Sequence, residues 1–150
     1  GMFEGTIAKF TALAVLLPVV AGQSGNTGAQ SLAVVIRGLA LRDIRPSQWL
    51  RVSGKEVYVA FLNGLAVSAT ACIAVGLWSR SLGLVFIIGL SMIISMVIAG
   101  LSGAIIPIAL KALKQDPAQS SSIVLTTVTD VVGFFSFLGL ATLLSSLLET

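Results

Sequence analysis

Long apolar stretches separated by short polar segments make up most of this chain of 150 residues. A helix that crosses a bilayer needs about 20 predominantly apolar residues, and four stretches approach or exceed that length. They cover residues 6–22 with a continuation at 31–41, then 57–78, 84–110 and 122–148. The pattern predicts an all-α fold: a polytopic helical membrane protein with about four transmembrane helices, in one domain over residues 1–150.

The first apolar stretch contains features that usually interrupt a helix. Pro18 removes a backbone hydrogen bond, and a polar island that includes Asn26 and several glycines follows at residues 22–30. Unwound backbone at membrane depth is tolerated where it lines a cavity, and broken helices of this type often form ion sites. We therefore expect a broken helix here, with a plain loop leaving the membrane as the alternative.

Composition supports the membrane assignment and excludes several classes of protein. Hydrophobic residues make up 56% of the chain and charged residues 10%, with a mean hydropathy of +1.03, whereas a soluble domain has about 25% charged residues. Histidine is absent and Cys72 is the single cysteine, which excludes a disulfide framework and a thiolate or imidazole metal site. Gly22-Gln-Ser-Gly25 has the form found around the serine of rhomboid-type proteases, but without a His base an enzyme is not expected.

The basic residues indicate the orientation of the chain, whose net charge is +3. Residues 37–55 contain five basic residues, and residues 111–117 contain Lys111 and Lys114, so the positive-inside rule places both segments in the cytoplasm. The turn at 78–81 and both ends of the chain then lie outside. An outside start without a signal peptide predicts that a further helix precedes this segment, so we expect a fragment of a larger protein.

Asp130 is the single charged residue within the last apolar stretch. A carboxylate at such a depth costs about 2.5–3.5 kcal/mol on insertion scales, so it usually faces a water-filled path or a cation. Thr126 and Ser122 lie one and two helical turns earlier, and Thr127 adds another hydroxyl. These oxygens suit a hard cation that keeps part of its water, with Mg²⁺ as the leading case. The alternative is an aspartate that hydrogen-bonds a neighbouring helix.

One carboxylate in each chain cannot form a closed cage around a metal ion. Two copies about a two-fold axis would bring two Asp130 side chains to one pore, so we expect a homodimer surrounded by lipid. Glu56 follows Lys55 at the cytoplasmic start of its span, where a local ion pair or a helix cap is expected and a cation contact is the alternative. The small-residue pairs Ser91/Ser95 and Ala99/Gly103 are expected to pack helices together.

Three blocks of sequence resemble one known family. The first block consists of Pro18 and the segment Gly22-Gln-Ser-Gly-Asn26-Thr-Gly-Ala-Gln-Ser-Leu-Ala-Val-Val-Ile-Arg37. The second contains Pro107, Lys111 and Asp116-Pro-Ala. The third is Thr126-Thr-Val-Thr-Asp130-Val-Val-Gly133. In this order they resemble the transmembrane domain of the MgtE magnesium channels, which are related to the eukaryotic SLC41 carriers.

The resemblance implies a homodimeric Mg²⁺ channel of the cell (inner) membrane, with its pore on the two-fold axis. Asp130 matches the aspartate that binds Mg²⁺ centrally, Thr126 and Ser122 match earlier positions on the pore face, and the island with Asn26 matches the kinked part of a pore helix. The family domain normally has five spans, so its first helix is missing here, as are the soluble N-terminal and CBS domains that sense cytosolic Mg²⁺. A proline common before the last helix is also absent from residues 120–123.

Passage of hydrated Mg²⁺ into the cytoplasm is therefore the function we expect. Two alternatives are a Na⁺-coupled Mg²⁺ exchanger of the SLC41 kind and a non-transporting scaffold that mainly dimerises. The absence of histidine and of deep thiolates argues against a strong preference for Mn²⁺ or Co²⁺.

Overall fold

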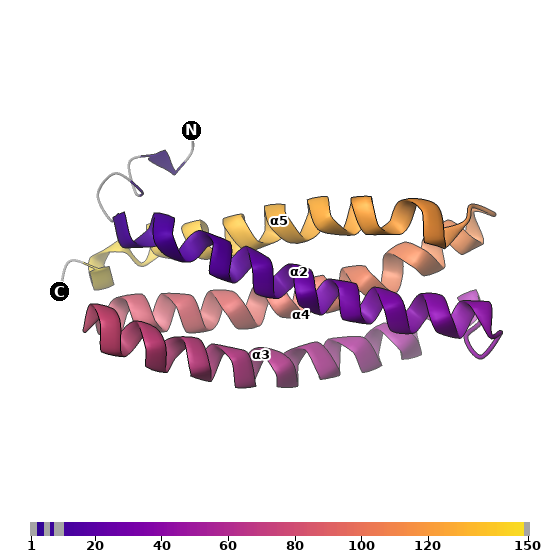
Figure 1. The fold of residues 1–150 in the computed structure, drawn as a ribbon, viewed down its shortest axis with the longest axis horizontal. Helices are drawn as coiled ribbons and strands as arrows, with labels where there is room; N and C mark the ends of the chain where they lie inside the picture. The colour runs from indigo at the N-terminus through magenta and orange to yellow at the C-terminus, as the bar shows by residue number, and fades with distance from the viewer. Residues whose placement is uncertain (1–2, 5–6, 8–10, 149–150) are drawn as a thin grey trace.

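The structure is a computed structural model that describes residues 3–4, 7 and 11–148, without the side chains of residues 119, 120 and 147. Its four long helices are α2 (Thr11–Ala40), α3 (Trp49–Ser79), α4 (Leu82–Ala112) and α5 (Pro117–Leu143), with short 3₁₀ helices at Pro46–Gln48 and Ser145–Leu148. Successive helices run in opposite directions, so α2 begins at the end of the bundle where α5 finishes (Figure 1). The prediction of an all-α helical fold is confirmed.

Three helical segments of the described chain are long and apolar enough to cross a membrane: Pro46–Ser79, Leu82–Ala112 and Ser121–Leu143. The helix α2 is 30 residues long, but Gln23, Asn26 and Gln30 lower its hydropathy and it is not among them. The predicted start of its span at residue 6 lies outside the described residues.

The expected break in the first span is wrong, because α2 continues from Thr11 to Ala40 with Pro18 inside it. None of the described glycines has a positive φ angle. The glycines of the island instead allow close packing: a Cβ atom at Gly28 would lie 3.1 Å from Leu125 and Thr129 side-chain atoms and 3.3 Å from the Ala99 carbonyl oxygen. Small residues at helix interfaces let backbones approach closely in membranes. The resulting contacts with α4 and α5 stabilise α2 in its helical form across the island.

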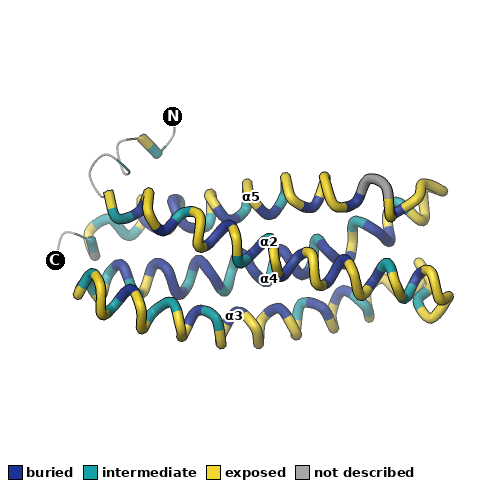
Figure 2. The backbone as a smooth tube through the Cα atoms, viewed as in Figure 1, coloured by how far each residue is buried: buried dark blue, intermediate teal, exposed yellow. Residues whose placement is uncertain are grey.

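The helix α4 lies at the centre of the bundle and packs against α2, α3 and α5. In its most apolar window 56% of residues are buried, compared with 22% for α3 and 28% for α5. Figure 2 shows the consequence, because α4 is largely buried whereas α3 exposes one side along its length. Ser91, Ser95, Ala99 and Gly103 are all buried on α4, as predicted for residues that pack helices.

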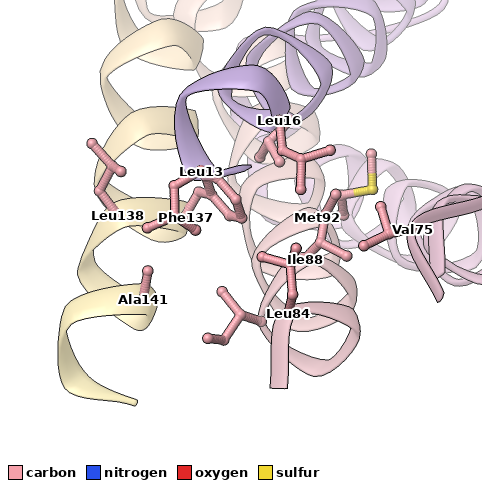
Figure 3. Packing of buried hydrophobic residues seen from close by; sticks show 11 residues of the cluster. Leu13, Leu16, Val75, Leu84, Ile88, Met92, Phe137, Leu138 and Ala141 are labelled. Carbon is pink, nitrogen blue, oxygen red and sulfur yellow. The ribbon is translucent and has the colours of Figure 1, made fainter. Parts of the chain in front are cut away.

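A hydrophobic core joins all four helices near the end where α2 begins (Figure 3). Phe137 of α5 and Leu13 of α2 are fully buried there, and Ile88 of α4 and Val75 of α3 complete the contact. A second, smaller cluster near the other end includes Val35 of α2 and Ala104 of α4. Apolar contacts at both ends therefore fix α2 along the full length of α4.

Candidate functional site

The candidate cation-binding residues of the last span lie on one exposed stripe of α5. Ser122, Thr126 and Asp130 are spaced four residues apart and all three are exposed, as expected for one face of a helix. Asp130 is the only charged residue between Pro117 and Leu143. Within the described part of the chain no hydrogen bond or ion pair holds its carboxylate, so the predicted alternative, a hydrogen bond to a neighbouring helix, is not observed.

The opposite face of α5 determines which way this stripe points. Leu125 and Thr129 are buried against α2, and the Thr129 carbonyl accepts a hydrogen bond from the Ser24 hydroxyl at 3.2 Å. A Cβ atom at Gly133 would lie 3.0 Å from the Ala21 Cα atom, so the two backbones are in close contact. This packing allows little rotation of α5, and it keeps Asp130 on the surface of the bundle.

The threonine hydroxyls next to Asp130 are oriented by their own helix. Thr126 Oγ1 donates to the Ser122 carbonyl at 2.9 Å, and Thr127 Oγ1 donates to the Ile123 carbonyl at 3.0 Å. With its hydrogen used in this way, each oxygen keeps lone pairs that can accept a hydrogen bond from water. The stripe therefore offers a carboxylate and hydroxyl oxygens to the water shell of a cation.

Asn26 lies apart from these residues. It is exposed on α2 and lines a hollow of about 680 Å³ between α2 and α3, together with Gln23 and Asn63. None of the described α5 residues lines this hollow. A single copy of the chain therefore does not combine Asn26 with Asp130 in one site.

The structure also corrects the expectation for Glu56. The helix α3 begins at Trp49 with Gln48 as its N-cap, two turns before Glu56, so Glu56 does not cap it. Its side chain is only 7% exposed, and among the described residues no ion pair joins it to Lys55. Sequence reasoning missed this burial, although the spacing of Glu56, Ala60, Gly64 and Ser68 indicates a helix face that packs closely.

Within the described residues, no three or more His, Cys, Asp or Glu side chains gather into a group that could hold a metal ion. A cation bound to one copy would therefore keep most of its water ligands, as Mg²⁺ commonly does in proteins.

Comparison with known proteins identifies relatives over most of the chain. The model of a family described as MgtE, divalent cation transporter, matches residues 17–140. The magnesium transporter MgtE of Thermus thermophilus is 39% identical over 142 residues, which is 95% of this chain and 31% of the relative. Its namesakes in Bacillus subtilis and Enterococcus faecalis are 36% and 33% identical over 93% and 94% of this chain, and again 31% of each relative is covered.

Proposed function

Because the chain belongs to the MgtE family of divalent cation transporters, we propose that it forms the membrane part of a transporter that passes Mg²⁺ into the cytoplasm. The family consists of transporters rather than enzymes, and the described chain has three helices suited to a membrane. Three relatives are named magnesium transporters, and this chain spans 31% of the length of each. The cytosolic domains of such longer proteins would act together with the segment described above.

The observation that carries the proposal is the exposed carboxylate of Asp130, which has no partner among the described residues and lies on the surface of an apolar helix. A lone charge that faces hydrocarbon is unfavourable, and such residues almost always face a bundle interior or a water-filled cavity. In a homodimer with the α5 stripes facing one another, two Asp130 carboxylates would meet across the two-fold axis. That arrangement would give the carboxylates both water and a counter-ion.

In this mechanism Mg²⁺ moves by electrodiffusion with part or all of its water shell. Two Asp130 carboxylates concentrate the ion through water-mediated contacts, because Mg²⁺ releases its water reluctantly. The hydroxyls of Thr126 and Ser122 lie one and two turns along the same stripe and accept hydrogen bonds from the hydrating water. Asn26 faces the hollow between α2 and α3 in a single copy, so it would line the pore only if the partner copy brings its α5 beside that hollow.

The proposal is tested by Mg²⁺ flux into liposomes that contain the chain. We expect Asp130→Asn, which removes the charge and keeps the size, to lower flux at least about tenfold. The matched control is Asp43→Asn, which removes an exposed carboxylate outside the helices and should leave flux unchanged. Wild-type flux through a folded Asp130→Asn chain would contradict the proposal. Flux that follows an imposed Na⁺ gradient would indicate a coupled exchanger instead of a channel.

A further inference from the structure

A polar groove runs between α2 and α3 on the side of the bundle that α5 does not line. Both helices pack against α4 but make few contacts with each other. The groove consists of the hollow that Asn26 lines and a second hollow of about 230 Å³, and Thr27, Gln30 and Asn63 line both. The second hollow continues the groove to Glu56 and Lys55, toward the basic segment at residues 37–55.

Two residues that line the second hollow are almost completely buried, but their polar atoms remain open to the hollow and have no partner among the described residues. Thr27 is 6% exposed and Glu56 is 7% exposed, and within the described residues neither side chain has a hydrogen bond or an ion pair. One turn before Glu56, on the same face of α3, Ser53 Oγ is buried without a hydrogen-bond partner. Buried polar groups in proteins are nearly always paired, and Ser53 Oγ is the one such atom without a partner among the described residues. The oxygens of Thr27 and Glu56 are open to the hollow, where water or an ion can serve as their partner.

Charge makes a cation the suitable occupant. A carboxylate on a residue that is only 7% exposed is unfavourable without a cation near its oxygens. Lys55 lines the same hollow, but in the described structure its ammonium group and the Glu56 carboxylate are not within the 4.0 Å of an ion pair. The groove therefore places an acidic group where a mobile cation can reach it, with a lysine near enough to compete.

The size and chemistry of the hollow fit a hydrated divalent ion. One water occupies about 30 Å³, so an ion with six waters needs roughly 180 Å³, which is less than the volume of about 230 Å³. Besides the Glu56 carboxylate, the lining offers the Thr27 hydroxyl and the amide oxygens of Gln30 and Asn63. One carboxylate with neutral oxygens is the set that a hydrated hard cation uses.

We propose that Glu56, with Thr27, Gln30 and Asn63, forms a second divalent-cation site in the groove between α2 and α3, separate from Asp130. The identity of the ion as Mg²⁺ rests on the proposed function. The site adds a binding position at the end of the groove that lies near the basic segment. Lys55 lines the same hollow without an ion pair to Glu56, so its positive charge opposes the binding of the ion.

The proposal is tested by Mn²⁺ binding to the chain in lipid nanodiscs, because Mn²⁺ replaces Mg²⁺ at oxygen sites and its free form is measured by electron paramagnetic resonance. Glu56→Gln keeps the size of the side chain, and we expect it to weaken one class of bound Mn²⁺ at least about tenfold. Asp130→Asn should leave that class intact, as should the control Asp43→Asn. Mg²⁺ should displace the bound Mn²⁺ from the wild-type chain.

Lys55→Gln provides an independent test that does not alter the ligands. If Lys55 competes with the ion, its removal should tighten Mn²⁺ binding at this class of site by about threefold or more. Wild-type Mn²⁺ binding by both folded variants, Glu56→Gln and Lys55→Gln, would overturn the second site and leave the proposal for Asp130 standing. Loss of this class in Glu56→Gln, with flux unaffected by Asp130→Asn, would support the second site and contradict the proposed function.

Discussion

Gly103 shows how a single residue sets the distance between two helices of this bundle. A Cβ atom at this position would overlap the Gly28 carbonyl oxygen of α2 and lie 2.9 Å from the Ser31 Cβ atom and 3.1 Å from the Leu32 nitrogen. These atoms belong mostly to backbone, so they cannot move aside without shifting a helix. The absence of a side chain at Gly103 is therefore a requirement of the contact between α2 and α4.

Gly103→Ala should destabilise the fold by about 1–3 kcal/mol, the range for overpacking a close contact. The measurement is the free energy of unfolding in mixed micelles titrated with a denaturing detergent. Gly54→Ala is the matched control, because a Cβ atom there would meet nothing within 4 Å and alanine should stabilise the helix by about 0.5–1 kcal/mol. Equal stability of the two variants would contradict this account of the contact.

At the level of residues, the sequence alone identified Asp130 as a candidate cation-binding residue but did not reveal that Glu56 is buried. Asp130 is conspicuous because no other charge lies within α5, and its exposed stripe follows from helical spacing alone. Glu56 is flanked by Lys55 and lies near Arg51, as an ordinary solvated helix end would be. Its burial depends on how α3 packs against α4, through contacts such as that of Ala60 with Gly100, and such contacts are not visible in hydropathy.

At the level of elements, serine hydroxyls connect α2 to both neighbouring helices. Ser31 Oγ donates to the Gly100 carbonyl of α4 at 2.9 Å, and Ser24 Oγ donates to the Thr129 carbonyl of α5 at 3.2 Å. Both serines are buried. Their hydroxyls therefore bond to carbonyls inside the bundle and do not face lipid. Ser24 Oγ also donates to the Ala21 carbonyl of α2 at 2.9 Å, and most other described serine and threonine hydroxyls of the bundle bond to carbonyls of their own helix alone, as Ser102 does to Ile98.

Ser31→Ala should weaken the attachment of α2 to α4 by about 0.6 kcal/mol, the average for a hydrogen bond between membrane helices. Ser102→Ala is the matched control, because its hydroxyl bonds to the Ile98 carbonyl within α4 and its loss removes no contact between helices. The detergent titration described for Gly103 measures both variants. A loss no greater in Ser31→Ala than in Ser102→Ala would argue against a role for Ser31 in holding α2.

Hydropathy located the helices well but misjudged the start of α3 and the interior of α2. The predicted span at 57–78 lies inside α3, which begins at Trp49 because its first two turns are helical yet carry Arg51 and Lys55. The predicted break at Pro18 is absent, since membrane helices tolerate proline where neighbouring groups compensate. Propensity scales measured in water penalise the glycines at 22, 25 and 28, whereas here Gly28 packs closely against α4 and α5.

At the level of the whole molecule, the proposed homodimer makes a prediction about which faces meet. If the α5 stripes face one another across a two-fold axis, the two Thr126 side chains lie close together, whereas the exposed side of α3 faces lipid. In a Cys72→Ala background, Thr126→Cys should therefore give cross-linked dimers with a short thiol-reactive cross-linker in membranes. Ala74→Cys, at an exposed position of α3, should give few.

The readout is the fraction of dimer on a denaturing gel, at several protein-to-lipid ratios. A specific dimer gives a fraction for Thr126→Cys that persists on dilution with lipid, because the partner is bound rather than encountered by chance. Cross-linking that is equal at both positions, or that disappears on dilution, would contradict a dimer built on the α5 stripe.

The polar character of α2 also has a consequence for the order in which the chain enters the membrane. The hydroxyl of Ser31 finds its acceptor 69 positions later in the sequence, and that of Ser24, which also bonds to the Ala21 carbonyl of its own helix, gains a second acceptor 105 positions later. During synthesis α2 leaves the ribosome before the acceptors on α4 and α5 exist, and over its described residues it is not among the helices that are apolar enough to cross a membrane. Although α2 precedes α4 and α5 in the chain, its full stabilisation thus waits for those two helices to arrive.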